Sequence, residues 1–232
     1  MKSYYTLNST IVTGIFIKEL KNRFLCIVRI NHKDVECYIP CSSHLDHFID
    51  LVGKKVLVTP NIQPGTRTAY SVLAVKYKRR NIILNTFIAN KALYSFLMYN
   101  KTKFYQNDCI ISSEKKIHNY KSDILIEWQA KKEVIEVKSI ISVYPRATFP
   151  TIFSARAIKQ LEQFLQFPDN VTTQCCFISL SPYIEELYIN KDQYQYYDLF
   201  YKCLNQGMKC KAYTCSLVGN KIKITKEIPI II

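Results

Sequence analysis

The chain has 232 residues, of which 48% are hydrophobic and 22% are charged, so its composition excludes a disordered or low-complexity protein and allows a large core. Charge is the unusual property, because 32 Lys and Arg residues against 18 Asp and Glu give a formal net charge of +14, which favours a polyanionic partner such as nucleic acid, with anionic lipid as the alternative. The longest apolar stretches, residues 11–17 and 228–232, are far shorter than the roughly 18–20 residues that a membrane span requires.

Residues 1–80 contain short apolar segments separated by turn signals. Five strands are expected, at residues 9–19, 23–30, 34–40, 54–60 and 69–78. One helical turn is expected at residues 42–52, between the third and the fourth strand. Five short strands with a helical turn in that position favour a small β-barrel of the OB type. We therefore expect residues 1–80 to form an OB-like barrel that binds nucleic acid.

Basic residues lie at the ends of these strands. Barrels of this type often bind single strands through a basic groove and aromatic side chains. At the end of the fifth strand Tyr77 is followed by Lys78, Arg79 and Arg80, and Arg23 begins the second strand. These four basic residues are candidate nucleic-acid contacts. The alternative for residues 76–80 is a solvated charge run at a domain junction.

Cysteine usage gives a further expectation. The N-terminus lacks the apolar core and cleavage site of an export signal, so the nine cysteines are expected to be reduced thiols in a cytoplasm. Cys37, Cys41, His44 and His47 have the donor atoms for one tetrahedral zinc. Because structural zinc sites usually draw ligands from two separated segments, core or surface roles are favoured for these four residues.

The pattern changes after residue 81. A helix is expected at residues 86–100, with Thr86 as its N-cap. Later elements are expected as strands at 108–116, 122–130 and 133–141, a loop at 144–150, a helix at 153–167, a strand at 173–181, a helix at 192–207, and strands at 210–218 and 221–228. This order predicts that residues 81–232 form a mixed sheet flanked by helices.

Residues 133–139, EVIEVKS, place an acid and an amine on one strand face, because alternate side chains of a strand face opposite ways. Glu136 and Lys138 share this face. Asp123 opens the preceding strand, and a tight connection at residues 129–132 would make the two strands antiparallel neighbours, with Asp123 and Glu136 close across the ladder. Two carboxylates at that separation repel each other, and a hard divalent cation removes the repulsion.

The set predicts metal-assisted phosphodiester hydrolysis. Mg²⁺ or Mn²⁺ would lie between Asp123 and Glu136, with the Val137 carbonyl as an extra ligand. Lys138 would hold the attacking water or the phosphate. Glu114, assigned to the strand before Asp123, is a possible third acid for a second metal or a water. The alternative is a half-solvated strand with a salt-bridged outer face.

Two helix residues extend this hypothesis to substrate binding. Arg156 and Lys159 lie at i and i+3 on one helix face, which suits phosphate contacts. The expected partner is nucleic acid, DNA first, in the cytoplasm or at the nucleoid, with neither a membrane nor an obligate protein partner. Two alternatives stay open: a DNA-binding regulator that keeps the fold without cleaving, and an interaction module whose basic surface contacts an acidic protein.

The residues also resemble a known family. The runs SEKKIHNYKSDILIEW, VIEVKSI and FPTIFSARAIKQLEQF are similar to the C-terminal half of the sugar fermentation stimulation protein (SfsA) family, whose members carry an Ile-Glu-Val-Lys-Ser strand before an Arg-rich helix. RFLCIV, PCSSHL and ILNTFIANKAL resemble further family segments, so the resemblance spans the chain. It implies an OB-like N-terminal domain, a C-terminal domain similar to PD-(D/E)xK nucleases, and DNA binding.

The resemblance also implies roles for single residues. Glu114, Asp123, Glu136 and Lys138 would be the active-site set, and Arg156 and Lys159 would match helix positions that face the substrate. The chain departs from the family at several positions: Cys41-Ser42-Ser43 in place of Asn-Thr-Gly, His118 in place of a turn glycine, Thr151 in place of Asp, and Gln160 in place of His.

Overall fold

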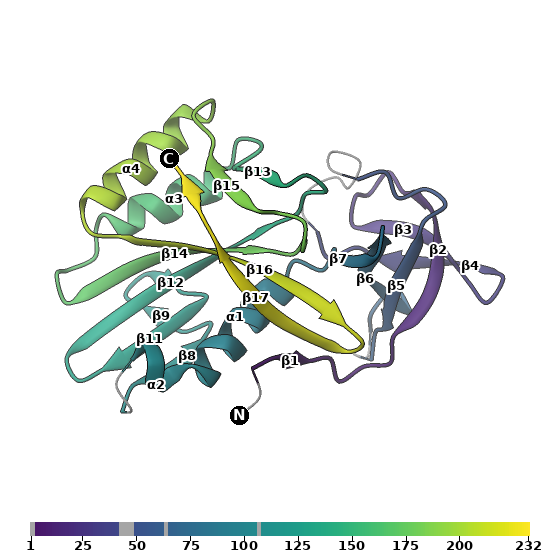
Figure 1. Cartoon of the computed structure of the whole chain (residues 1–232), viewed down its shortest axis with the longest axis horizontal. Coiled ribbons are helices and arrows are strands. Elements are labelled where there is room, and N and C mark those ends of the chain that lie inside the picture. Colours follow the sequence, from purple (N-terminus) through teal and green to yellow (C-terminus); the bar gives the residue numbers. More distant parts are fainter. Residues whose placement is uncertain (1–2, 42–48, 63–64, 106–107) are drawn as a thin grey trace.

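The computed structural model describes residues 3–41, 49–62, 65–105 and 108–232. A small β-barrel lies beside a larger mixed sheet that has helices on both faces (Figure 1). The OB-like barrel and the flanked mixed sheet predicted from the sequence are both confirmed.

Five strands close the barrel in the order β4-β3-β2-β5-β6, with a parallel pairing of β4 and β6 joining the two ends. This is the strand order of an OB fold. A short sixth strand, β7, continues from β6 through a hairpin. The strands are β2 (Val12–Glu19), β3 (Leu25–Ile30), β4 (Lys33–Tyr38), β5 (Lys55–Pro60), β6 (Tyr70–Tyr77) and β7 (Arg80–Ile83).

The barrel core is built from alternating apolar residues, as a period of two requires. Phe16, Val28, Val56 and Val72 all point inward and are buried. Most of the expected helical turn at residues 42–52 lies outside the described residues, and the described remainder, residues 49–52, is not helical.

The larger sheet has seven strands in the order β1-β17-β16-β14-β12-β11-β8. The central strands β12, β14 and β16 are parallel, and the outer pairs are antiparallel. The strands are β1 (Tyr5–Thr6), β8 (Ile110–Ser113), β11 (Ile124–Trp128), β12 (Lys131–Ile140), β14 (Val171–Ser179), β16 (Lys209–Val218) and β17 (Lys221–Ile228).

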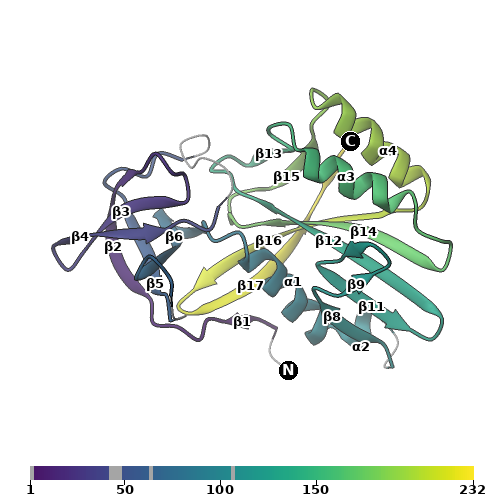
Figure 2. The same ribbon diagram turned by 180° about the vertical axis from the view of Figure 1, so that it is seen from behind.

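Helices cover both faces of this sheet, as Figures 1 and 2 show from opposite sides. Helix α1 (Ile88–Tyr99), followed by the short α2 (Lys101–Phe104), packs on the face that buries Ile135. Helices α3 (Ala155–Phe164) and α4 (Tyr194–Asn205) pack on the face that buries Val134. Strand β12 is therefore buried on both sides.

Three local predictions were wrong. Thr86 does not cap α1, because its hydroxyl donates to the Pro40 carbonyl at 2.8 Å and Phe87 is the N-cap residue. The expected loop at residues 144–150 contains a strand, which belongs to a three-stranded sheet: β13 (Arg146–Phe149), β15 (Glu186–Ile189) and β18 (Ile230–Ile231). The expected strand at residues 108–116 is interrupted, because β8 ends at Ser113 and Lys116 belongs to a small hairpin formed by β9 (Lys116–Ile117) and β10 (Tyr120–Lys121).

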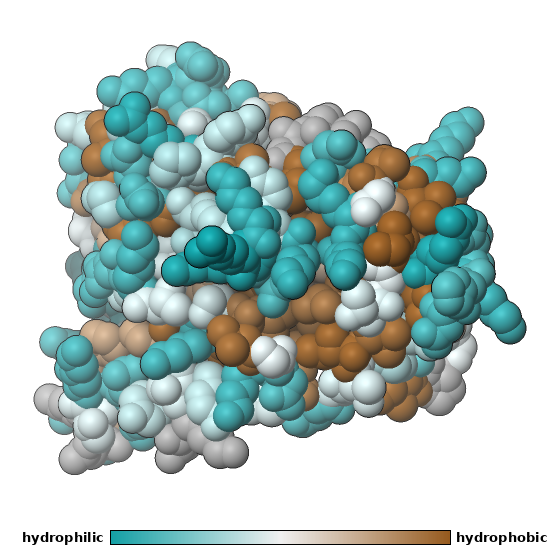
Figure 3. All heavy atoms as spheres, turned by 45° about the vertical axis from the view of Figure 1, so that its right-hand side comes forward, coloured by the Kyte–Doolittle hydropathy of each residue, from teal (hydrophilic) through white to brown (hydrophobic). Residues whose placement is uncertain are grey.

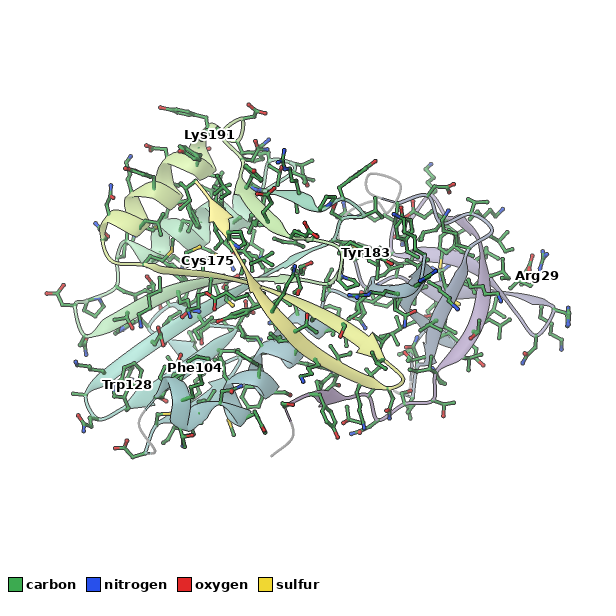
Figure 4. The ribbon with its side chains drawn as sticks, in the orientation of Figure 1. Arg29, Phe104, Trp128, Cys175, Tyr183 and Lys191 are labelled. Atoms are coloured by element: carbon green, nitrogen blue, oxygen red, sulfur yellow. The ribbon has the colours of Figure 1, made fainter. Side chains whose placement is uncertain are left out.

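The barrel and the large sheet are in contact at their junction, where the Ile83 N–H of β7 donates to the Leu180 carbonyl at 2.9 Å. The expected boundary at residue 80 falls at the start of β7, which continues the barrel sheet, while the N-terminal β1 pairs with β17 of the large sheet. Tyr183, labelled in Figure 4, lies at this junction and donates a hydrogen bond to the Tyr77 carbonyl at 2.7 Å. Within the described ranges, no helix combines the length and apolar character needed to cross a membrane.

Candidate active site

The hairpin of β11 and β12 sets the geometry of the site. A two-residue turn, Gln129-Ala130, joins the strands, and the register pairs Ile124 with Ile135. One step further along the same register places Asp123 opposite Glu136. The antiparallel pairing predicted from the sequence is therefore correct.

Asp123 is held by two hydrogen bonds. Its Oδ2 accepts from the Val137 backbone N–H at 2.8 Å, and its Oδ1 accepts from Asn90 Nδ2 on α1 at 2.8 Å. Burial, and next the charge of Glu136, raise the pKa of Asp123 to about 6 although both hydrogen bonds oppose the change. The pKa of Asp123 is therefore raised mainly by burial and secondly by the neighbouring acid.

Glu136 lies on the face of β12 that α3 covers and is only 4% exposed. Its Oε1 accepts from Lys138 Nζ at 3.0 Å and also from Gln160 Nε2, while its Oε2 accepts from the Tyr120 hydroxyl. Lys138 Nζ donates in turn to Gln160 Oε1. The half-solvated strand is therefore the wrong interpretation, because the acid and the amine are enclosed under α3.

Sequence reasoning missed three residues that bond to the two acids: Asn90, Gln160 and Tyr120. Gln160 was noted only as a departure from the family pattern, and Tyr120 was not singled out. The signal for Gln160 is its place in the apolar stripe of α3, beside the buried Ala157, Leu161 and Phe164. Tyr120 comes from β10, and its ring packs against Phe164 at 5.6 Å between centres.

Glu114 stands apart from this cluster. It follows β8, and its backbone N–H donates to the Asp123 carbonyl at 3.0 Å, but its side chain is 67% exposed and pairs with Lys121 at 2.6 Å. That ion pair lowers the pKa of Glu114. The structure thus brings together Asp123, Glu136 and Lys138 but not the Glu114 carboxylate.

The candidate nucleic-acid contacts lie on the surface. Arg156 and Lys159 are exposed on α3, and Arg156 is one turn before Gln160. On the barrel, Lys78 and Arg79 form the turn between β6 and β7, and Arg80 opens β7. Figure 3 brings the barrel side forward and shows long hydrophilic side chains projecting from it.

Two of the basic residues on the barrel lie against aromatic rings. The Arg23 guanidinium is 5.1 Å from the centre of the Phe24 ring. Lys78 Nζ is 5.5 Å from the centre of the Tyr77 ring and 5.9 Å from that of Tyr183. A basic side chain beside an aromatic ring is the combination that single-strand-binding surfaces use.

The donor set suits a hard cation. Asp123 and Glu136 supply carboxylate oxygens. In a β-strand the N–H and C=O of one residue point to the same side, so the Val137 carbonyl faces the same edge as the N–H that contacts Asp123. Among the described residues, no group of three or more His, Cys, Asp or Glu side chains is placed to hold a metal. Two carboxylates with a carbonyl and water are typical of Mg²⁺ rather than of zinc.

The described cysteines have core roles. Cys37 and Cys41 are buried in the barrel core, whereas His44 and His47 lie outside the described residues. All nine cysteines of the chain are described, and all are free thiols, eight of them buried. Burial raises the pKa of Cys210, the partly exposed one, to about 12, so it is protonated at neutral pH.

Comparison with known proteins agrees with this fold. The family model described as sugar fermentation stimulation protein RE domain matches residues 87–221. A sugar fermentation stimulation protein homolog of Pelagibacter ubique (strain HTCC1062) is 26% identical over 226 residues, covering 95% of this chain and 97% of the relative. Another, of Clostridium beijerinckii (strain ATCC 51743 / NCIMB 8052), is 24% identical over 158 residues, covering 68% of each chain.

A solved structure has the same architecture. The structure of Pyrococcus furiosus SfsA in complex with Ca²⁺ matches with a TM-score of 0.85 and 20% identity, covering 100% of both chains. At that identity the likeness shows the fold. The fold, the family match over residues 87–221 and the relatives that cover the chain together place this protein in the sugar fermentation stimulation protein family.

Proposed function

We propose that this protein is a divalent-metal-dependent nuclease that binds DNA and hydrolyses its phosphodiester bonds in the cytoplasm. The observation that carries the proposal is the cluster of Asp123, Glu136, Lys138 and Gln160, in which the charges of two carboxylates repel each other and Glu136 contacts one ammonium group. A structural ion pair needs one acid and one base. The second acid, Asp123, has its pKa raised to about 6, and a buried carboxyl group with a perturbed pKa beside another acid is typical of a functional site.

Mg²⁺ or Mn²⁺ is the proposed cofactor, held by Asp123, Glu136 and the Val137 carbonyl. When bound, such an ion supplies Lewis-acid polarisation of the phosphate and lowers the pKa of a bound water. The Ca²⁺ complex of Pyrococcus furiosus SfsA supports a divalent-ion site in this fold. Glu114 is left out of the proposed ligand set because its side chain faces solvent and Lys121.

The protein's own residues have separate tasks in this proposal. Lys138 orients the attacking water or the phosphate, since its ammonium contacts the Glu136 carboxylate at 3.0 Å and its charge also acts on Asp123. Gln160 fixes Lys138 and Glu136 relative to each other by bonding to both. Tyr120 holds the second oxygen of Glu136, so the carboxylate is set in one orientation.

DNA binding is assigned to the exposed basic side chains. On α3, the DNA would contact Arg156 and Lys159, beside the cluster. On the barrel, the DNA would contact Arg23, Lys78, Arg79 and Arg80. Contacts of this kind are mostly to phosphate, so they position the DNA without reading its sequence.

Cleavage of labelled DNA in the presence of Mn²⁺ tests the proposal. Wild type is expected to cleave, and Asp123→Asn and Lys138→Met are expected to lose cleavage while they keep DNA affinity and folding. Glu127→Gln is the matched control, because Glu127 is an acid of the same hairpin that pairs with Lys132 at 3.2 Å, away from the cluster. Cleavage by Asp123→Asn at the wild-type rate would remove the cluster from the mechanism.

A DNA-binding regulator that does not cleave is the second candidate. The observation that favours it is that the exposed basic side chains lie outside the acid cluster. DNA binding by these side chains would therefore not require the cluster. Saturable DNA binding without any cleavage in Mg²⁺, Mn²⁺ or Ca²⁺ would select this candidate.

A further inference from the structure

A pocket on the opposite face of the sheet has a separate set of aromatic and basic side chains. It has a volume of about 260 Å³ and is lined by Lys103, Phe104, Tyr105 and Trp128. Figure 4 labels Phe104 and Trp128, which lie close together at the outer end of the sheet. Trp128 is five residues from Asp123 along β11, roughly 17 Å at the rise of an extended strand.

A buried acid holds one wall of this pocket in place. Glu133 is 1% exposed, on the opposite side of β12 from Glu136. Its Oε2 accepts from the Tyr105 hydroxyl at 2.8 Å, and its Oε1 accepts from Lys209 Nζ at 2.8 Å. The Tyr105 ring is thereby fixed 5.8 Å from the Trp128 ring, measured between centres. The wall is a preset aromatic surface rather than a loose side chain.

The other wall of the pocket is the Phe104 ring, which lies near two lysine ammonium groups. Phe104 is 39% exposed, and the ammonium groups of Lys103 and Lys211 each lie 5.8 Å from its centre. Glu133 is already neutralised by Lys209, and Lys211 is 3.7 Å from Glu227. Lys103 has no acidic partner within the described ranges, so the rim keeps a positive charge.

We propose that this pocket binds one unpaired base of a single-stranded nucleic acid, with the base against Phe104 and Trp128 and its phosphate beside Lys103. The inference rests on the proposed function and narrows its substrate to DNA with a single-stranded segment. Every base has a flat π-face that stacks on aromatic side chains, and the adjacent phosphate supplies the charge that the rim lacks. An uncharged aliphatic ligand would leave the charge of Lys103 without a partner.

Trp128 is the single tryptophan of the chain, so intrinsic tryptophan fluorescence reports on this pocket alone. The titration uses metal-free protein and three probes: an oligothymidylate, an abasic strand of equal length, and a blunt duplex. We expect the oligothymidylate to quench the emission and the other two to leave it nearly unchanged. Quenching of equal size by the abasic strand, or oligothymidylate binding seen by anisotropy with unchanged emission, would overturn the proposal.

Variants separate this pocket from the acid cluster. Phe104→Ala is expected to weaken oligothymidylate binding about tenfold, the usual effect of losing one stacking partner. Tyr201→Ala on α4 is the matched control, because Tyr201 is also an exposed aromatic residue but lies elsewhere. Asp123→Asn is expected to keep the quenching while losing cleavage. In the wild-type protein, cleavage without quenching would refute only the pocket, and quenching without cleavage would refute only the nuclease.

Discussion

Asp123 is the residue at which opposing effects on ionisation meet most clearly. Its two hydrogen bonds favour the ionised form, yet burial and Glu136 favour the protonated form more strongly. In the absence of metal, ionisation of Asp123 therefore works against folding.

This conflict gives a pH-dependent stability. The pKa of Asp123 is about 6 in the folded chain against 3.8 for a free aspartate, so the folded state binds the proton more tightly. Its favourable contribution is complete below pH 4 and disappears as pH rises through 6. Asp123→Asn is expected to raise the free energy of unfolding of metal-free protein by about 1–3 kcal/mol at neutral pH, and by much less near pH 4.

Urea unfolding in EDTA at the two pH values measures this effect. Glu127→Gln, which removes an acid that is not in the cluster, is expected to be nearly neutral at both. Destabilisation by Asp123→Asn at neutral pH would mean that the carboxylate is fully compensated by its partners.

Gln160 is expected to act as a positioning residue. Gln160→Leu removes both its bond to Glu136 and its bond to Lys138, so cleavage is expected to fall about 10- to 100-fold while DNA affinity is kept. Gln160→His restores a polar ring at the position where the family resemblance has His, and is expected to recover part of the rate. Single-turnover cleavage with Mn²⁺ measures both. Equal loss in the two variants would point to packing rather than to hydrogen bonding.

At the scale of the element, the barrel depends on one close approach between strands. A Cβ at Gly14 in β2 would lie 2.5 Å from Val28 Cγ1 and 3.0 Å from the Arg29 carbonyl. Val28 is fully buried in β3 and has no room to move. Gly14→Ala is therefore expected to lower the free energy of unfolding by about 1–3 kcal/mol, read from urea or thermal unfolding. An unchanged midpoint would show that the barrel relaxes at this point.

Elements with local patterns were predictable from the sequence, and elements defined by distant partners were not. The β11–β12 hairpin follows from two apolar strands with a short turn, so the approach of Asp123 and Glu136 was predicted correctly. Strand β13 pairs with β15, forty residues later, and is only four residues long between Pro145 and Pro150, so the local sequence favours a loop. Its partner β15 is equally short, and the sequence analysis did not predict it.

The same distinction applies within the site. Lys138 is two residues from Glu136 on one strand face, which a period of two reveals. Asn90 is 33 residues from Asp123, and Gln160 is 24 residues from Glu136. Those contacts arise only when α1 and α3 pack on opposite faces of the sheet, and a single sequence does not specify that packing.

At the scale of the whole molecule, the net charge of +14 is the property that governs affinity. Binding to DNA is expected to weaken steeply with salt, because each phosphate contact releases counterions. A combined Lys78→Ala, Arg79→Ala and Arg80→Ala variant is expected to reduce the slope of log affinity against log salt by about 1–3, since each contact contributes roughly 0.9.

Fluorescence anisotropy at several salt concentrations measures the slope. Lys202→Ala is the control, because Lys202 is an exposed basic residue on α4 that pairs with Asp198 at 2.7 Å. A slope that is unchanged in the triple variant would restrict DNA binding to other surfaces, such as that of α3.

The central claim is that Asp123 and Glu136 together hold one divalent cation. Anomalous diffraction from a Mn²⁺-soaked crystal tests it most directly. We predict one anomalous peak between the two carboxylates, about 2.0–2.3 Å from an oxygen of each, with the Val137 carbonyl beside it, and no such peak in Asp123→Asn. Ordered Mn²⁺ elsewhere in the crystal, with none between these carboxylates, would contradict the account.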